Sequence, residues 1–363
     1  MTYQLINSRL FVASIFLSSF TLATSSAYAL TVQEQLGKAA YFDTNLSEPA
    51  GQSCASCHDP STGFADPDQD LPVSEGVIAG RFGGRNSPSA SYAAFFPEFD
   101  AVNVRGGQFW DGRAANLTEQ AKGPFLNPVE MNNTSREQVI QKVASSAYSS
   151  LFFATCGVDA ILPSNTDATY HCIASAIAAY ESTTEVNPFS SRYDCAQNRR
   201  VSLNMQERRG LKLFRGKAKC SNCHSLSRQH HLKKSNLDLF TDFLYHNLGL
   251  PKNNEFPFTG NEPVDLGVGA IINDAAYYGK FKTEHLRNIA LTPPYMHNGV
   301  LKTLKDVVHF YNTRDIQGLW PAPEYPATMD TRSLGNLGLS NAEEDAIVAF
   351  MQTLSDGYAC PVR

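Results

Sequence analysis

The residues of this chain best suited to binding a cofactor lie in two short cysteine motifs. Both read C-x-x-C-H, and they start at Cys54 and at Cys220. This spacing is the attachment signal for c-type haem, in which two thiols add to the vinyl groups and the histidine ligates the iron. A zinc knuckle or a redox dithiol also uses C-x-x-C, but a zinc site needs a second pair of ligands. The motifs therefore predict two covalently bound haems. The predicted attachment residues are Cys54, Cys57 and His58 for the first haem and Cys220, Cys223 and His224 for the second.

Four cysteines remain outside these motifs. In an oxidising compartment an even number of spare thiols suggests two disulfides, and four thiols allow three connectivities. We predict the pairs Cys156–Cys172 and Cys195–Cys360. The alternative is that some of these thiols are buried and free.

Composition and the first residues narrow the class of protein. The 363 residues are 42% hydrophobic and 18% charged, which suits a soluble protein. The net charge of −5 predicts no basic face for nucleic acid or anionic lipid. Arg9, an apolar run and a small-x-small site ending at Ala29 predict a signal peptide over residues 1–29. No cysteine follows for lipid attachment and no other stretch could span a bilayer, so we expect a periplasmic protein without a membrane anchor.

Similar helices are expected just before each haem motif. Capping boxes at Thr31 and Asn204 open helices that run through Phe42 and Phe214. Both helices contain Gln-Glu-x-x-Gly, a weak internal repeat that favours two related haem-binding units. Two unrelated helices with common caps are the alternative.

Strand signals are few, so we predict an all-α fold of two cytochrome c-like haem domains with long loops. The N-terminal haem domain is expected over residues 30–198 and the C-terminal one over 199–363. Abundant Gly, Pro, Ser and Asp between residues 58 and 107 predict long loops there. Further helices are expected over residues 117–122, 135–153, 172–180, 303–311 and 340–354, with a short strand or hairpin between 233 and 278.

These residues and several motifs in order resemble the bacterial dihaem cytochrome c peroxidase family and, within it, the MauG-like branch. The resemblance runs from Glu34 to Ser355. Besides the two haem motifs, it rests on N-S-P at Asn86, F-W-D-G-R-A at Phe109, G-P at Gly123, N-P-V-E-M at Asn127, H-N-L-G at His246, L-R-N at Leu286 and L-T-x-P-Y-M-H-x-G at Leu291.

The resemblance implies that peroxide reacts at the first haem. The family's distal carboxylate maps to Glu130, and Gln120 and Pro124 map to other distal positions. No histidine occurs between His58 and His171, so the sixth position of the first iron is expected to be open. A carboxylate there can move a proton between the two peroxide oxygens. The alternative for Glu130 is a solvated loop carboxylate.

The resemblance also implies an unusual ligand for the second iron. Family peroxidases place a methionine fourteen residues after the histidine of P-Y-x-H, and MauG-like enzymes place a tyrosine. Counting from His297 gives Tyr311, which we predict as the axial ligand. Met296 and His309 compete, although two helical positions lie about 200° apart and turn His309 away. The alternative for Tyr311 is a tyrosine of the core.

Three further features complete the implied site. Trp110 matches an aromatic bridge between the haems, with core packing as the alternative. Trp320 is either a surface relay or an incidental loop aromatic. The family holds a calcium ion through one asparagine side chain and two backbone carbonyls. These calcium ligands map to Asn86, Thr292 and Pro294.

The implied function is a periplasmic dihaem oxidase. Hydrogen peroxide creates a high-valent state of the two haems, which oxidises a protein substrate, a Trp residue in the family, by long-range electron transfer. In the MbnH-like branch the partner is copper-associated. One alternative is a conventional cytochrome c peroxidase that receives electrons from a small cytochrome or cupredoxin. A non-catalytic electron-transfer protein is the other. We expect a monomer or a homodimer.

Overall fold

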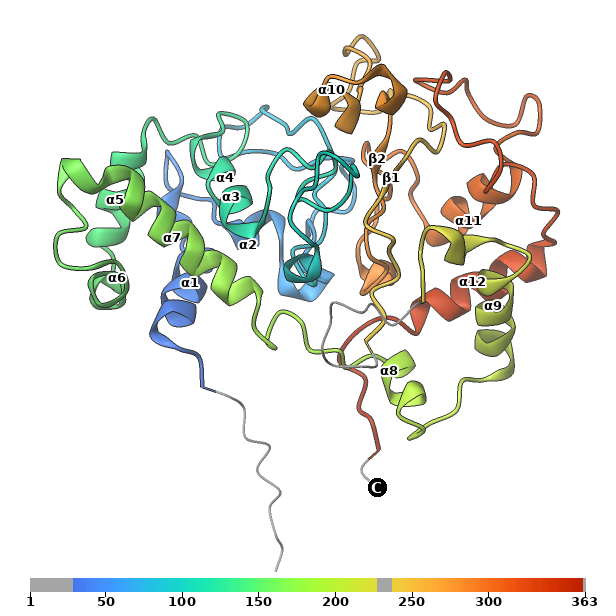
Figure 1. Cartoon of the computed structure of the whole chain (residues 1–363), viewed down its shortest axis with the longest axis horizontal. Helices are drawn as coiled ribbons and strands as arrows, with labels where there is room; N and C mark the ends of the chain where they lie inside the picture. The colour runs from blue at the N-terminus through green and yellow to red at the C-terminus, as the bar shows by residue number, and fades with distance from the viewer. Residues whose placement is uncertain (1–28, 227–236, 362–363) are drawn as a thin grey trace, which may run out of the picture.

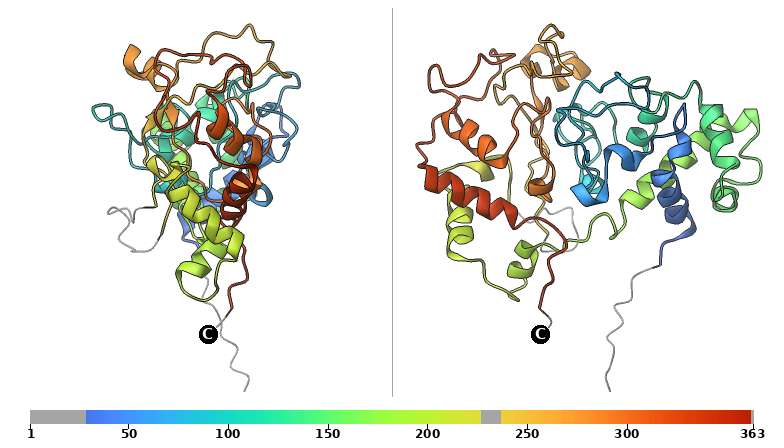
Figure 2. Two further views of the ribbon diagram at one scale, coloured as in Figure 1. Left: turned by 90° about the vertical axis from the view of Figure 1, so that its right-hand side faces the viewer. Right: turned by 180° about the vertical axis from the view of Figure 1, so that it is seen from behind.

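The computed structural model describes residues 29–226 and 237–361. The predicted signal peptide, apart from Ala29, lies outside the described residues. The regular secondary structure of the described residues is mostly helical, and the chain forms two lobes side by side, one from each half of the sequence (Figures 1 and 2). No helix in the described ranges is long and apolar enough to cross a membrane.

Within the described residues, the first lobe holds seven α-helices, and both lobes contain several short 3₁₀ turns. The helices of the first lobe are α1 (Val32–Phe42), α2 (Cys54–Cys57), α3 (Leu117–Ala121), α4 (Gly123–Leu126), α5 (Arg136–Ala144), α6 (Ser149–Cys156) and α7 (Thr166–Glu181). Those that follow are α8 (Arg192–Gln197), α9 (Met205–Arg215), α10 (Val268–Ile272), α11 (Leu304–Thr313) and α12 (Asn341–Gln352). Strands β1 (Tyr245–His246) and β2 (Phe281–Lys282) pair antiparallel between the lobes.

The predicted repeat has a packing counterpart in both lobes. A Cβ on Gly37 of α1 would lie 1.8 Å from the carbonyl oxygen of Ala176 in α7. A Cβ on Gly210 of α9 would lie 1.8 Å from the carbonyl oxygen of Ala346 in α12. Each glycine lets a helix before a haem motif touch the backbone of a later helix. The shared Gln-Glu-x-x-Gly pattern therefore encodes the same close helix contact twice.

Local signals placed most helices correctly. Thr31 and Asn204 both form the predicted capping boxes, with Glu34 and Glu207 at the third helical position. The helix predicted over residues 135–153 is wrong as a single element, because it breaks into α5 and α6 after residue 144. At the break the Ser145 hydroxyl donates to the Gln141 carbonyl oxygen at 2.7 Å, and Ser146 makes a similar bond to Val143. Such side-chain hydrogen bonds compete with continued helix.

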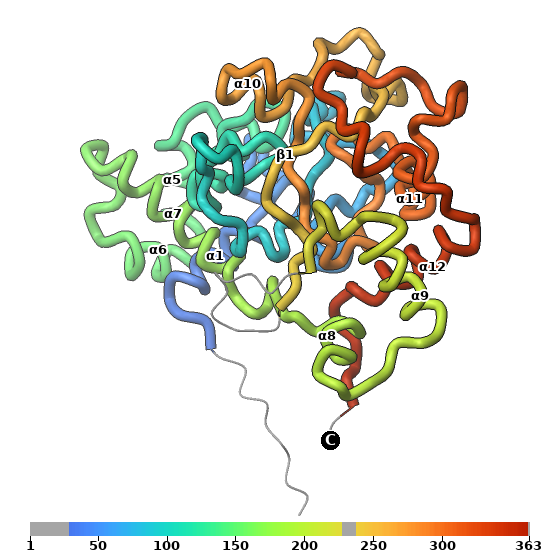
Figure 3. Tube along the Cα trace, turned by 45° about the vertical axis from the view of Figure 1, so that its right-hand side comes forward, coloured from blue at the N-terminus to red at the C-terminus, as the bar shows by residue number. Residues whose placement is uncertain are grey.

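Each lobe has its own buried core. The first extends in sequence from Leu36 to Val186 and the second from Tyr193 to Leu354. Tyr193 lies on α8, which the chain reaches along one side of the molecule after leaving α7 (Figure 3). The domain boundary at residue 199 stays a prediction.

Both predicted disulfides are confirmed. Cys156 at the end of α6 is bonded to Cys172 in α7. Cys195 in α8 is bonded to Cys360 near the end of the described chain, across a separation of 165 residues. The four cysteines of the haem motifs are free.

Candidate functional site: two cavities and the wall between them

The first C-x-x-C-H motif lines a cavity in the first lobe. Cys54 and Cys57 open and close the one-turn helix α2, and His58 follows. The Nδ1 atom of His58 lies 3.3 Å from the carbonyl oxygen of Phe64. Since a carbonyl only accepts, this contact favours a proton on Nδ1 and leaves Nε2 for a metal. Burial lowers the pKa of His58, so its imidazole is neutral, as a ligand must be.

The predicted distal residues line the same cavity. Gln120 lies on α3, Pro124 on α4, and Glu130 on the loop that follows. Burial raises the pKa of the Glu130 carboxyl, and the charge of Arg113 opposes part of that rise. Among the described residues lining this cavity, His58 is the only imidazole. Glu130 is therefore a carboxyl of this cavity whose pKa lies above its ordinary value.

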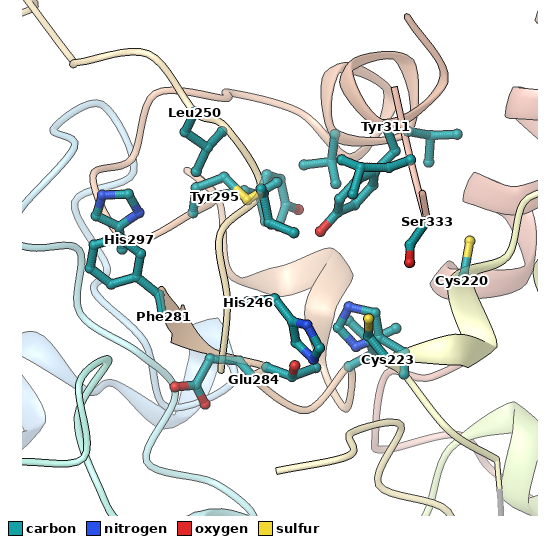
Figure 4. A pocket seen from close by; sticks show the side chains of 18 of the residues that line it. Cys220, Cys223, His246, Leu250, Phe281, Glu284, Tyr295, His297, Tyr311 and Ser333 are labelled. Atoms are coloured by element: carbon teal, nitrogen blue, oxygen red, sulfur yellow. The ribbon is translucent and has the colours of Figure 1, made fainter. Parts of the chain in front are cut away.

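The second motif lines a separate cavity in the other lobe (Figure 4). Cys220, Cys223 and His224 all border it. The Nδ1 atom of His224 lies 2.9 Å from the carbonyl oxygen of Phe240, which again leaves Nε2 for a metal. Burial lowers the pKa of His224 as it does that of His58. Both cavities thus present two free thiols and the neutral imidazole of the motif itself, the donor set that c-type haem requires. His246, His285 and His297 also border the second cavity.

Tyr311 enters the second cavity from α11, and its hydroxyl group points into the open space (Figure 4). No hydrogen bond of this hydroxyl to another described residue is found. Burial raises the pKa of Tyr311, and the Cys223 and Cys220 thiols add to the rise. The phenol therefore keeps its proton unless a cation binds its oxygen.

The two competing ligands fall in different places. His309 does not border the cavity, and its Nδ1 atom lies 3.0 Å from a carboxylate oxygen of Glu344 on α12. Met296 does border the cavity, with a left-handed backbone at φ 75°. Tyr295 also lines it, but its hydroxyl is used in a 2.9 Å hydrogen bond to the Ile289 carbonyl oxygen.

Four residues border both cavities and form the wall between them. They are Trp110, Asp265, Lys282 and Glu284. The backbone carbonyl of Trp110 accepts a 2.9 Å hydrogen bond from the Lys282 N–H, which joins the first lobe to β2. The indole lies 6.4 Å from the His297 ring, and His297 stacks on Phe281 at 3.6 Å. Trp110 thus lies between the two cavities.

Charged side chains, buried or partly buried, lie at the wall and beside it. Arg85 binds Asp265 through Nε at 2.7 Å and Asp111 through an Nη atom at 2.6 Å. Lys282, with a side chain only 3% exposed, lies 3.1 Å from a carboxylate oxygen of Glu284. Sequence reasoning missed these residues, because ordinary loop charges give no local signal of which cavity they face.

The three predicted calcium ligands lie on two adjoining loops. The Asn86 backbone N–H donates to the His297 carbonyl oxygen at 2.8 Å, and its side-chain amide donates to Pro72. Within the described ranges, no backbone N–H donates to the carbonyl oxygens of Thr292 and Pro294. One amide oxygen and two carbonyl oxygens that accept no backbone hydrogen bond from a described residue are ligand types that suit a hard cation.

Trp320 packs at the edge of the second core. Its ring lies 5.1 Å from that of Phe310 and 6.0 Å from that of His309. Its Nε1 donates to the Thr313 hydroxyl oxygen at 3.0 Å. It does not border the second cavity.

Two cavities, each with a C-x-x-C-H motif and joined by a tryptophan, define a dihaem c-type protein. The family model described as di-haem cytochrome c peroxidase matches residues 31–201. The methylamine utilization protein MauG of Paracoccus denitrificans is 37% identical over 345 residues, which is 88% of each chain. The chain therefore belongs to the di-haem cytochrome c peroxidase family, a family of oxidoreductases whose members carry two c-type haems.

Solved structures agree with this assignment. The diheme peroxidase BthA of Burkholderia thailandensis E264 superposes with a TM-score of 0.81 at 34% identity, covering 90% of this chain and 87% of that one. A MauG-like protein associated with microbial copper homeostasis superposes with a TM-score of 0.68 at 27% identity, covering 90% of both chains.

Proposed function

We propose that this protein is a periplasmic MauG-type oxidase, which uses hydrogen peroxide to remove two electrons from a protein substrate. The main support for the proposal is the Tyr311 hydroxyl inside the second cavity, which forms no hydrogen bond to another described residue. A phenol oxygen on the second iron is a hard anionic donor that favours ferric over ferrous iron. Such a centre is a poor acceptor of electrons from an ordinary cytochrome and a good store of oxidising equivalents.

The residues of the first cavity would carry out the peroxide step. Cys54, Cys57 and His58 would hold the first haem, which would supply iron chemistry toward peroxide when bound. Glu130 would take the proton of the near peroxide oxygen and return it to the far one, while Gln120 and Pro124 shape that side of the cavity. One peroxide, two electrons and two protons give two waters. Trp110 would carry the electrons between the cavities, because an indole is readily oxidised.

The substrate is proposed to be a tryptophan on a periplasmic partner that docks at the surface. The likeness to a MauG-like protein associated with copper homeostasis favours a copper-associated partner. Calcium would be held by Asn86, Thr292 and Pro294, and each lobe would be one haem domain. A conventional cytochrome c peroxidase is the second candidate, since Met296 borders the second cavity and could offer its sulfur.

One experiment separates these functions. Peroxide added to the diferric enzyme should give a long-lived oxidised spectrum, and mass spectrometry should then find an oxidised tryptophan in candidate periplasmic partners. Tyr311→His should keep both haems attached and abolish partner oxidation. Tyr295→Phe is the matched control, because it removes a hydroxyl from the same cavity and should leave the reaction intact. Fast turnover with reduced cytochrome c and no lasting oxidised state would instead establish the second candidate.

A further inference from the structure

Glu181 is a buried carboxyl in the first cavity that the peroxide chemistry does not use. It is the last residue of α7, is only 5% exposed and borders the same cavity as Cys54 and Glu130. Among the described residues, its Oε2 atom has no hydrogen-bond partner. Burying a carboxylate without a partner costs free energy. The Glu181 carboxyl is therefore either protonated or balanced by the positive charge of a group bound in the cavity.

No described cation is available to match this carboxyl. Lys38 on the neighbouring helix α1 is paired with Glu185 at 2.5 Å. Glu130 differs, because Arg113 favours its ionised form. Burial raises the pKa of Glu181 to about 8, and the carbonyl end of α7 also disfavours an anion there. The titratable groups that face Glu181 or lie near it are Tyr41 and Lys38 on α1, Cys54 on α2, Tyr180 on α7, Glu185 after it, and Glu130 across the cavity.

Glu181 lies toward the side of the cavity where the ring is attached. After burial, its charge is the largest influence raising the pKa of the Cys54 thiol. After burial, the Glu181 charge is also the largest influence that raises the pKa of Tyr41. The Tyr41 hydroxyl donates a hydrogen bond to the His58 carbonyl oxygen at 2.8 Å. A haem attached through Cys54 would therefore occupy the same cavity as this carboxyl.

We propose that Glu181 is a proton-binding site coupled to the oxidation of the first haem. Apart from its propionates, a haem is neutral with ferrous iron and carries one positive charge with ferric iron. Glu181 releases one proton to water when the ferrous iron loses one electron, and it takes one proton back when the ferric iron regains that electron. The inference depends on haem attachment at Cys54 and not on which substrate the enzyme oxidises.

The test is a spectroelectrochemical titration of the haem-loaded enzyme over a range of pH. The reduction potential of the first haem should fall as pH rises toward about 8, the pKa of Glu181. With one proton per electron, a tenfold fall in proton concentration changes the equilibrium tenfold, which is about 59 mV. Glu181→Gln should flatten this slope. Glu181→Asp should retain a slope, because it keeps a carboxyl.

Two controls separate this effect from a general change in charge. Glu185→Gln removes the same charge four residues away at an exposed position and should keep the wild-type slope. The potential of the second haem should not respond to Glu181→Gln, because Glu181 borders only the first cavity. A wild-type potential independent of pH, or the same slope in Glu181→Gln, would overturn the proposal.

If Glu181→Gln fails to fold, infrared difference spectra of the wild-type enzyme still test the proposal. Oxidation of the first haem should remove the carbonyl stretch of one protonated carboxyl group. Spectra without that loss would equally overturn the assignment.

Discussion

The indole Nε1 of Trp110 donates a 2.8 Å hydrogen bond to the backbone carbonyl oxygen of Asn86. This bond fixes the orientation of the only tryptophan that borders the two cavities among the described residues. It also ties the proposed electron bridge to the proposed calcium loop, so that disturbing the Asn86 loop should disturb the bridge.

Trp110→Phe should slow electron exchange between the haems while both stay attached. A phenyl ring packs in the same place but is much harder to oxidise than an indole. The lost hydrogen bond should lower the free energy of unfolding by about 1 kcal/mol. Stopped-flow spectra after peroxide should show a change at the first haem without the matching change at the second. Trp320→Phe is the control and should behave as wild type in this assay, because Trp320 does not border the second cavity.

Glu130→Gln should slow the reaction with peroxide by about 10²- to 10⁴-fold, the usual worth of a positioned acid–base group. Burial raises the pKa of Glu130 above 4.5, and its ionised form is the base. The wild-type rate should therefore rise with pH through that raised pKa, and the rise should vanish in the Gln variant. Stopped-flow absorbance at several pH values measures both effects. A Gln variant with wild-type rates would assign the proton transfer to another group.

The disulfides should differ in their contribution to stability. Closing a loop in the unfolded chain stabilises the fold more when the loop is longer, by about 3 kcal/mol for the Cys156–Cys172 loop and about 5 kcal/mol for the Cys195–Cys360 loop. Paired Cys→Ser variants of each bond, compared by thermal unfolding, should show the larger loss of Tm for Cys195 and Cys360. A larger loss of Tm for Cys156 and Cys172 would show that this disulfide stabilises the fold by more than its effect on the entropy of the unfolded chain.

Features encoded within a few residues were predictable from the sequence. The motifs at Cys54 and Cys220 and the caps at Thr31 and Asn204 depend on neighbours along the chain. The role of Gly37 was only partly predictable, since the repeat was visible but the helix it touches was not.

Features that depend on distant segments were not predictable. Lys282 and Asp265 reach both cavities because β2 and its neighbouring loop lie against the Trp110 loop. Glu181 ends an Ala-rich helix, and nothing in the sequence shows that its side chain faces Cys54. Contacts between loops of the two lobes produce no periodic pattern in the sequence from which they could be predicted.

The central claim is that the two irons have different surroundings, one open beside Glu130 and one closed by Tyr311. Electron paramagnetic resonance and resonance Raman spectra of the resting ferric enzyme test it most directly. The account predicts one haem with a vacant or weakly held sixth position and one with a tyrosine oxygen opposite His224, the latter lost in Tyr311→Phe. Two haems each closed by two strong protein ligands, or sulfur from Met296 on the second iron, would contradict it.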